Sequence, residues 1–210
     1  MKRVLLTGFE PFAGSSMNPS EQIVKALAAT GIVDSSGQPQ VQLHTAVLPV
    51  VFTESSELLK HLIKLHQPDI VICLGQAEGR REISFERVAI NLDDARLADN
   101  AGRTITDQPV VEGGQPAHFT TLPVKEMVAA VRAEGIAAGL STTAGTFVCN
   151  HIFYVLQHSL IGTGKHSGFI HVPLIEEQAS EFEGQPTMPL DQQVEAIRVA
   201  IRVAAGIHEA

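Results

Sequence analysis

The chain has 210 residues, 44% of them hydrophobic, and its 15 Lys and Arg against 23 Asp and Glu give a formal charge of −8. This length is enough to bury a sizeable core, and it fits one domain over residues 1–210 better than two. An acidic chain without a basic stripe argues against nucleic acid and anionic membrane surfaces as partners, because both attract clustered Lys and Arg.

The chain holds only two cysteines, Cys73 and Cys149, so it is not a disulfide-built scaffold and either thiol is expected to be free. No apolar run approaches the ~20 residues that a membrane helix needs. The apolar run near the N-terminus ends at Gly8, too early for a signal peptide. We therefore expect a soluble protein of the cytoplasm, with no membrane partner.

Short apolar strands alternate along the chain with segments of helical periodicity. A cap residue, a first-turn proline and a glutamate three positions after the cap (Asn18, Pro19 and Glu21) predict a helix start, and Pro68 must end the next helix. In chain order, the sequence predicts strands at residues 4–7, 41–48, 69–75, 83–92, 139–143 and 168–172, and helices from residue 19, across 58–65, at 123–133 and 147–160, and from a cap at Asp191.

Two stretches fit this alternation less simply. Residues 83–92 alternate imperfectly between apolar and polar, which predicts a bent strand or a hairpin. Residues 93–120 have no strong period and many Asp, Gly and Pro residues. They predict a long loop that covers a site or an interface, or is mobile.

The alternation predicts an α/β fold, a three-layer α/β/α domain whose open, twisted, mostly parallel sheet has helices on both faces. In such folds, functional residues gather at the carboxyl ends of the strands. Cys149 follows a strand-to-helix turn and lies in the first turn of a helix, where free N–H groups favour a thiolate and can bind a developing oxyanion. The alternative is a small buried residue that packs helix on sheet, and for Cys73, inside an apolar strand, we prefer that interpretation.

A cysteine nucleophile needs a base that accepts its proton and later protonates the leaving amine, which suits histidine. His171 stands near the end of an apolar strand that Pro173 stops, where it can face a helix N-terminus, unless it is a core histidine bonded to a carbonyl. His151 lies two residues from Cys149 and points in another direction. The remaining histidines are expected to be mainly solvated: His44, His61, His66, His118, His158, His166 and His208.

A carboxylate that orients the imidazole would complete a catalytic triad. Glu86 places a charge within a strand-like apolar segment, residues 84–91, which singles it out for that role. The alternative is a salt bridge to Arg87 or to another base. Spacing along the chain does not decide between the two.

Six segments of the chain resemble the pyrrolidone-carboxylate peptidases, also called pyroglutamyl peptidase I. They run in the family's order, and the combination of Thr-Phe-Val-Cys-Asn-His with Glu-Arg-Val-Ala is specific. The segments are LTGFEPF (6–12), QPD (67–69), GQAEGR (75–80), ERVAIN (86–91), TFVCNH (146–151) and GFIHVP (168–173).

The resemblance implies a single catalytic domain, residues 1–210, that removes N-terminal pyroglutamyl residues from peptides without metal or organic cofactor. It also implies a homo-oligomer, commonly a tetramer, with a dimer or monomer left open. The family's site residues fall on Cys149 (nucleophile), His171 (base), Glu86 (triad acid), Arg96 with Cys149 (oxyanion), and Phe9, Phe12, Phe147, Asn18 and Gln76 (lactam pocket).

The residues themselves agree with a lactam pocket. Pyroglutamate is a neutral, flat ring without a free amine, so its site should offer apolar ring faces and a few donors and acceptors. Phe9 and Phe12 can supply those faces, although ordinary core packing is the alternative. Two departures from the family pattern, Ala13 for glycine and Val50 for a threonine of some members, leave open whether the pocket edge makes one hydrogen bond fewer.

Two other functions remain alternatives. One is a nucleoside phosphorylase or hydrolase of similar sheet architecture, although the chain has neither a P-loop nor Gly-x-Gly-x-x-Gly and no basic cluster. The second alternative is a catalytically inactive module that binds pyroglutamyl peptides, against which the intact Cys149, His171 and Glu86 argue.

Neither Gly-x-Ser-x-Gly nor His-Glu-x-x-His is present, which argues against serine hydrolases and zinc enzymes.

Overall fold

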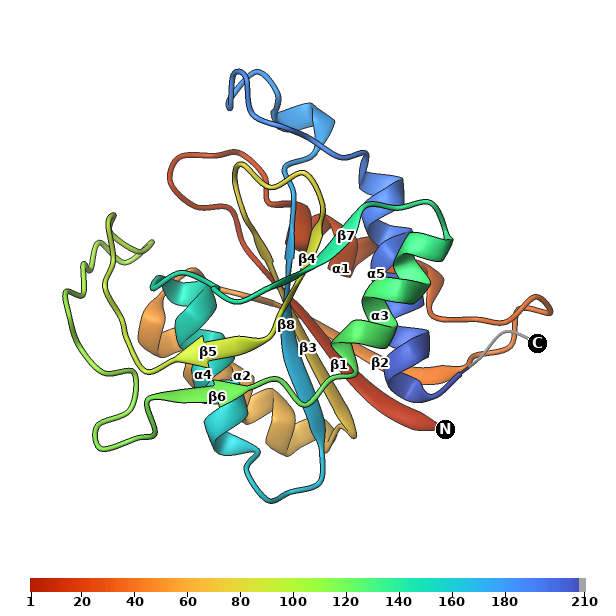
Figure 1. Cartoon of the computed structure of the whole chain (residues 1–210), viewed down its shortest axis with the longest axis horizontal. Coiled ribbons are helices and arrows are strands. Elements are labelled where there is room, and N and C mark those ends of the chain that lie inside the picture. The colour runs from red at the N-terminus through yellow and green to blue at the C-terminus, as the bar shows by residue number, and fades with distance from the viewer. Residues whose placement is uncertain (208–210) are drawn as a thin grey trace.

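A computed structural model describes residues 1–207. Six strands form a central sheet in the order β2-β1-β3-β8-β4-β7 (Figure 1), and two more form a small separate sheet. The strands are β1 (Lys2–Phe9), β2 (Val41–Leu48), β3 (Ile70–Gln76), β4 (Ile83–Glu86), β5 (Val88–Ile90), β6 (Ala117–Phe119), β7 (Ala138–Ser141) and β8 (His166–Val172).

The central sheet is mostly parallel, as the sequence predicts. β1 pairs in parallel with β2 and β3, β3 with β8, and β4 with β7, whereas β4 and β8 are antiparallel. Strand β8 thus joins the β2-β1-β3 half to the β4-β7 half. Every residue of β3 is buried, which explains its continuous apolar run.

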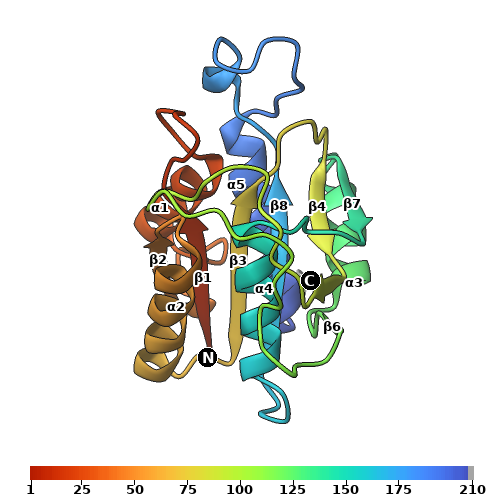
Figure 2. The same ribbon diagram turned by 90° about the vertical axis from the view of Figure 1, so that its left-hand side faces the viewer.

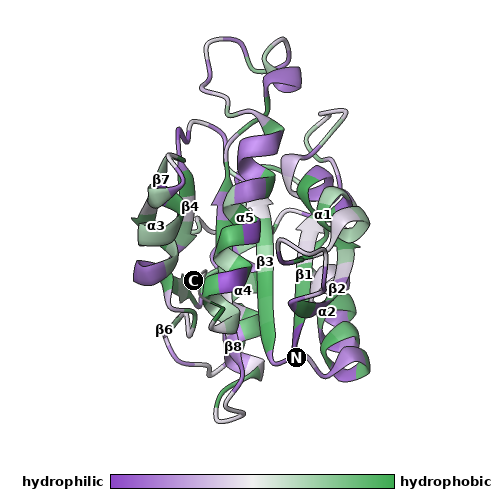
Figure 3. Ribbon diagram, turned by 90° about the vertical axis from the view of Figure 1, so that its right-hand side faces the viewer, coloured by the Kyte–Doolittle hydropathy of each residue, from purple (hydrophilic) through white to green (hydrophobic). Residues whose placement is uncertain are grey.

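Helices cover both faces of the sheet, which confirms the three-layer α/β/α prediction (Figures 1 and 2). One face packs against α1 (Pro19–Thr30), α3 (Val124–Ala133) and α5 (Leu190–Ala205), and the other against α2 (Phe52–His66) and α4 (Val148–Ser159). Figure 3 shows the hydrophobic colour along β1 and β3, while α5 mixes hydrophobic and hydrophilic residues. Each helix therefore buries one apolar stripe against the sheet.

The two helix starts that the sequence singled out behave differently. At α1, Asn18 caps the helix by accepting the Ser20 N–H, as predicted, while Glu21 pairs with Lys25 instead of reaching back to the cap. The predicted cap at Asp191 is wrong: Pro189 holds the cap position of α5 and Asp191 lies in the first turn. Pro189 has φ −51 and ψ 139, the extended backbone that is usual at a cap position, and Asp191 in the first turn still favours the helix dipole.

Residues 83–92 form two strands in different sheets, β4 and β5, which separate at Arg87. β5 pairs antiparallel with β6, which lies at the end of the predicted loop 93–120. The rest of that loop folds back on itself through the bridge between Asp93 and Gln108. It covers the start of α4, because Asp94 and Thr146 exchange two hydrogen bonds.

Candidate active site

The thiol of Cys149 lies at the carboxyl edge of the sheet. Cys149 is in the first turn of α4 and is partly exposed, while Cys73 in β3 is fully buried. Gly75, near the end of β3, permits this close approach, since a Cβ placed there would lie 2.8 Å from Cys149 Sγ. Cys149, which the sequence places just after a strand-to-helix turn, therefore packs with its sulfur against the edge of the sheet.

The surroundings of Cys149 favour the protonated thiol. Burial, with smaller contributions from the Glu86 carboxylate and the Cys73 thiol, raises the pKa of Cys149 to about 12. The free N–H groups of the helix start act in the opposite direction and are outweighed. Desolvation of a sulfur held against an apolar sheet edge is the stronger effect, so the thiol needs a base to deprotonate it.

His171 and Glu86 form a buried pair beside this thiol. His171 Nδ1 lies 2.8 Å from Glu86 Oε1, and both side chains are almost completely inaccessible to solvent. The β3–β8 register places His171 opposite Gly75, the residue against which Cys149 Sγ rests. The structure thus brings together the three residues that the sequence singled out as nucleophile, base and acid.

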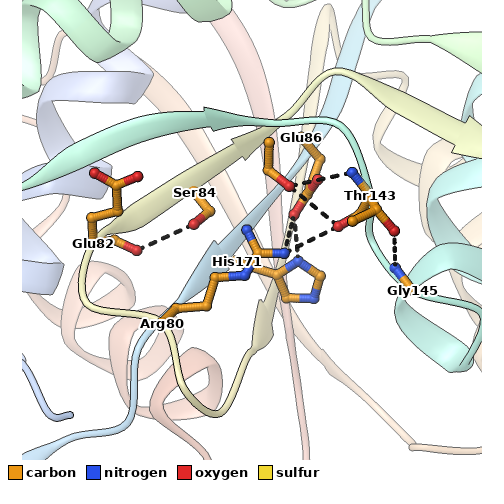
Figure 4. A network of polar contacts seen from close by, with 8 residues as sticks. Arg80, Glu82, Ser84, Glu86, Thr143, Gly145 and His171 are labelled. Carbon is orange, nitrogen blue, oxygen red and sulfur yellow. Dashed lines mark hydrogen bonds and ion pairs between the residues drawn. The ribbon is translucent and has the colours of Figure 1, made fainter.

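Glu86 has a second partner, an arginine that the sequence analysis did not identify. Arg80 Nη2 lies 3.2 Å from Glu86 Oε1 and donates to the Thr143 carbonyl at 3.0 Å (Figure 4). The salt bridge considered as the alternative role of Glu86 therefore exists together with the histidine contact, but it involves Arg80 and not Arg87. The GQAEGR segment that ends at Arg80 was the available signal.

A narrow apolar cavity opens beside Cys149. All five predicted pocket residues meet there: the cavity is lined by Phe9, Phe12, Asn18, Val50, Gln76, Phe147, Val148 and Cys149. The ring centroids of Phe12 and Phe147 are 6.3 Å apart, and about 10 Å³ is open to a water-sized sphere. None of the lining side chains is charged, so the cavity suits a small neutral ring once these two aromatic rings separate.

Of the two departures from the family pattern, Val50 lies at this cavity, while Ala13 is exposed in the loop that follows Phe12. Val50 lines the cavity directly, so its isopropyl group adds apolar surface where a threonine would add a hydroxyl. Ala13 has a φ of 54°, in the left-handed region that favours glycine. The loop that carries Phe12 thus holds its turn with an alanine in a strained conformation.

Arg96, unlike the five predicted pocket residues, does not line the cavity. It is exposed on the segment that covers the start of α4, and its guanidinium makes no hydrogen bond or ion pair with any of residues 1–207. The backbone N–H of Cys149, in the first turn of α4, is a donor position independent of Arg96.

A second histidine–carboxylate pair lies outside this site. His151 Nδ1 is 2.7 Å from Asp93 Oδ2, both side chains are buried, and neither His151 Nε2 nor Asp93 Oδ1 has a partner within the described chain. Its ring meets Phe52 edge-on at 5.5 Å. As predicted, the His151 side chain points in a different direction from that of Cys149. Its contact with Asp93 links the segment at residue 93 to α4.

The prediction that the other histidines are mainly solvated is wrong for four of them, because His44 and His66 are half-buried and stack with ring centroids 4.1 Å apart, and His118 and His158 are half-buried as well. His118 Nε2 and His158 Nδ1 lie 3.2 Å apart in a half-buried cluster with Tyr154, because α4 packs against β6. His208 lies outside the described residues. Within residues 1–207, no three His, Cys, Asp or Glu side chains are grouped to hold a metal ion, and no helix has the length and apolarity to cross a bilayer.

Comparison with known proteins agrees with the site. The model of the family described as pyroglutamyl peptidase matches residues 2–206. The chain is 46% identical over 209 residues to a pyrrolidone-carboxylate peptidase of Bacillus mycoides, covering 99% of this chain and 94% of that one. It is 48% identical over 203 residues to pyrrolidone-carboxylate peptidase 1 of Ralstonia nicotianae, covering 96% and 92%.

A solved structure shares the whole architecture. The crystal structure of pyroglutamyl peptidase I from Bacillus amyloliquefaciens matches with a TM-score of 0.90 at 42% identity, covering 98% of both chains. The resemblance drawn from six short motifs therefore extends over nearly the entire chain, including residues between the motifs. The chain belongs to the pyroglutamyl peptidase family of cysteine peptidases.

Proposed function

We propose that this protein hydrolyses the bond after an N-terminal pyroglutamyl residue of peptides, with Cys149, His171 and Glu86 as the catalytic triad. One observation carries the proposal: Cys149 lines an uncharged, phenylalanine-walled cavity while the His171–Glu86 pair stands at the same sheet edge. A nucleophile and its base thus adjoin a pocket of lactam chemistry.

The cavity selects against ordinary N-termini through its lack of charge. A peptide with a free α-amine would bury an ammonium without a carboxylate partner, which costs several kcal/mol. A pyroglutamyl ring carries no charge and presents two flat faces to Phe12 and Phe147. The substrate class is therefore N-terminally pyroglutamylated peptides, and the ring-closed residue is the recognised feature.

The proposed reaction starts with transfer of the Cys149 proton to His171 Nε2, because Nδ1 is engaged by Glu86. The sulfur attacks the pyroglutamyl carbonyl carbon, and the Cys149 N–H together with Arg96 stabilises the oxyanion. The C–N bond breaks as His171 protonates the leaving amine, which leaves a thioester. Water, deprotonated by His171, then hydrolyses the thioester to free pyroglutamate and the thiol.

Glu86 has an electrostatic role in each proton transfer. Its carboxylate orients the imidazole and stabilises the imidazolium that forms when the thiol loses its proton. This matters here because burial raises the pKa of Cys149 to about 12. Without a stabilised imidazolium, proton transfer from such a thiol would be strongly unfavourable.

The proposal is tested with paired chromogenic substrates. We expect the wild-type protein to cleave a pyroglutamyl chromophore and leave the glutaminyl chromophore, with its free amine, intact. Cys149→Ser should lose cleavage, whereas Cys73→Ser, a matched substitution of the other thiol, should retain it. Equal cleavage of both chromophores would refute the lactam pocket, and binding without turnover would support a binding module instead.

We further propose that residues 1–210 act as one catalytic domain, without metal or organic cofactor, in a cytoplasmic homo-oligomer, either a tetramer or a dimer. Light scattering of the purified protein measures the assembly. Retention of activity after dialysis against a chelator tests the independence from metal, and loss of activity restored by a metal would contradict it.

A further inference from the structure

We infer that Gln178 is a positioning residue that determines specificity. It orients the side-chain amide of Gln76 so that the NH₂ group of Gln76 faces the lactam pocket. The inference rests on the proposed function, which supplies the pocket with its ligand class. Gln178 itself does not line the cavity, so it acts on the substrate through Gln76.

Gln178 ends η1 (Glu176–Gln178), in the segment between β8 and α5 that projects beyond the sheet (Figures 1 and 2). The two residues before it, Glu176 and Glu177, are exposed, as expected of a surface projection. Gln178, in contrast, has 0% of its surface exposed. A long polar side chain turned fully inward from such a segment needs hydrogen bonds to compensate for its desolvation.

Backbone groups fix which way round the Gln178 amide lies. The Ile175 N–H, which is only a donor, points at Gln178 Oε1 at 3.2 Å. The Met17 carbonyl, which is only an acceptor, lies 3.3 Å from Gln178 Nε2. Exchanging the oxygen and nitrogen of this amide would break both contacts, so its orientation is determined by chemistry.

The orientation of Gln178 in turn determines that of Gln76. Gln178 Nε2 donates to Gln76 Oε1 at 2.9 Å, and the Gln76 side chain is itself buried. The Gln76 oxygen is therefore engaged, and the NH₂ end of this amide, a pure donor, is left for the cavity that Gln76 lines.

Asn18, the other amide of the cavity, is committed in the same sense. Its Oδ1 accepts from both the N–H and the hydroxyl of Ser20, and its Nδ2 donates to the Glu10 carbonyl with one hydrogen to spare. Both amides thus offer donors and withhold acceptors. A lactam carbonyl satisfies such donors, whereas the CH₂ at the same position of a cyclopentanecarbonyl ring, which is also neutral, leaves them unpaired.

A nearby residue provides a matched control. Gln178 also reaches Ser15 Oγ, in the loop that carries Phe12, at 3.4 Å. The same loop is held by Glu181, which accepts from Ser15 and Ser16 at 2.6 and 2.7 Å on the exposed side. Replacing Glu181 loosens the loop and leaves the amide relay to Gln76 intact.

The experiment compares Gln178→Met, Gln178→Glu and Glu181→Ala with the wild type on a pyroglutamyl chromophore and on a cyclopentanecarbonyl chromophore, whose ring is neutral and lacks the lactam. Gln178→Met removes the donor at nearly constant volume. We expect its KM for the pyroglutamyl chromophore to rise about tenfold with kcat within about threefold, since the lost contact serves ground state and transition state alike. Its preference for the pyroglutamyl over the cyclopentanecarbonyl chromophore should fall by the same factor, and Glu181→Ala should change each value less than about twofold.

Gln178→Glu adds a readout that a merely structural role would not move. A carboxylate cannot donate to Gln76 Oε1, but a protonated carboxyl can. Burial favours the protonated form, so the KM of this variant, relative to wild type, should fall toward unity as the pH is lowered. Circular dichroism of each variant establishes that it is folded before its kinetics are compared.

Each outcome decides the inference. The inference is overturned if a folded Gln178→Met variant has the same KM and selectivity as Glu181→Ala. It is also overturned if the defect of Gln178→Glu is independent of pH. In both cases the proposed function is unaffected. If the wild-type protein neither cleaves the pyroglutamyl chromophore nor binds 2-pyrrolidone in calorimetry, the proposed function and the inference both fail. A tenfold rise in KM with lost selectivity, confined to the Gln178 variants, supports the inference.

Discussion

Gly75 and Cys149 touch where strand β3 meets the start of α4: a Cβ on Gly75 would lie 2.8 Å from Cys149 Sγ and 2.8 Å from Phe169 Cζ. Gly75→Ala should therefore displace the thiol. We expect the free energy of unfolding to fall by about 1–3 kcal/mol, the usual cost of overpacking a core. The activity of the folded variant should fall about 100-fold, as for a misplacement of ~1 Å at a reacting atom.

The measurements are urea unfolding and kcat/KM for the pyroglutamyl chromophore, with the alkylation rate of Cys149 as a direct probe of the thiol. Wild-type activity in a stable Gly75→Ala protein would contradict the assigned position of the nucleophile.

Arg80 shares Glu86 Oε1 with His171, and this contact predicts a loss of activity when the arginine is removed. The Arg80 guanidinium also donates to the Thr143 carbonyl, so it fixes the Glu86 carboxylate beside the imidazole. Arg80→Met should therefore lower kcat/KM about tenfold, because the carboxylate that orients the imidazole loses one of its two contacts.

Arg81→Met is the control, because Arg81 is the exposed neighbour of Arg80 and its removal changes the net charge equally. Arg80→Lys should retain part of the effect. An equal loss of kcat/KM in the Arg81 and Arg80 variants would indicate general surface electrostatics rather than the contact with Glu86.

The raised thiol pKa predicts how Cys149 reacts without its base. In His171→Ala, the pKa of Cys149, raised to about 12 by burial, should make the alkylation rate rise about tenfold per pH unit from pH 7 to 10 without a plateau. In the wild type, a plateau at lower pH should report proton transfer to His171. Iodoacetamide labelling followed by peptide mapping measures both.

Cys73 serves as the internal reference in that experiment. Burial also raises the pKa of Cys73 to about 12, against a contribution from the Thr7 hydroxyl that lowers it, and the side chain is fully inaccessible. It should remain unlabelled in the native protein at every pH. Labelling of Cys73 before Cys149 would overturn the choice of nucleophile.

The Asp93–His151 pair predicts a stability effect separate from catalysis. Asp93→Ala leaves the buried imidazole of His151 without its carboxylate, which should cost about 3 kcal/mol of unfolding free energy. The double variant Asp93→Ala, His151→Ala should cost less than the sum of the single variants, because the two residues interact directly. Chemical unfolding of the four proteins gives this coupling free energy.

Kinetics distinguish the two histidines. We expect His151→Ala to keep kcat/KM within about fivefold of wild type once folded, whereas His171→Ala should lose about 1,000-fold or more. A large loss of kcat in His151→Ala without loss of stability would assign it to the chemistry and contradict the proposed triad.

The sequence predicted the layered fold because its signals are local. The buried β3 run bounded by Pro68 and the α1 cap at Asn18 each depend on residues close together in the chain. Local signals also gave one wrong prediction: Asp191 is a good cap residue, yet α5 begins at Leu190 with Pro189 at the cap position. The break at Arg87 between β4 and β5 likewise depends on pairing with distant strands.

The candidate site was predictable only where its residues stood out by position or motif. Nothing in the sequence around Gln178 indicates that it reaches Gln76, 102 positions earlier. The same holds for Asp93 and His151, separated by 58 positions. The burial of Cys149, which opposes the helix end, also depends on packing that periodicity does not encode.

Strand β8 lies between β3 and β4, and it carries His171 at the place where the two halves of the sheet join. Glu86 and His171 are 85 positions apart, so their contact forms only when this strand inserts. With the proposed triad, a nascent or refolding chain is therefore inactive until β8 has paired with β3 and β4, and the first turnover of a refolding molecule reports completion of the sheet.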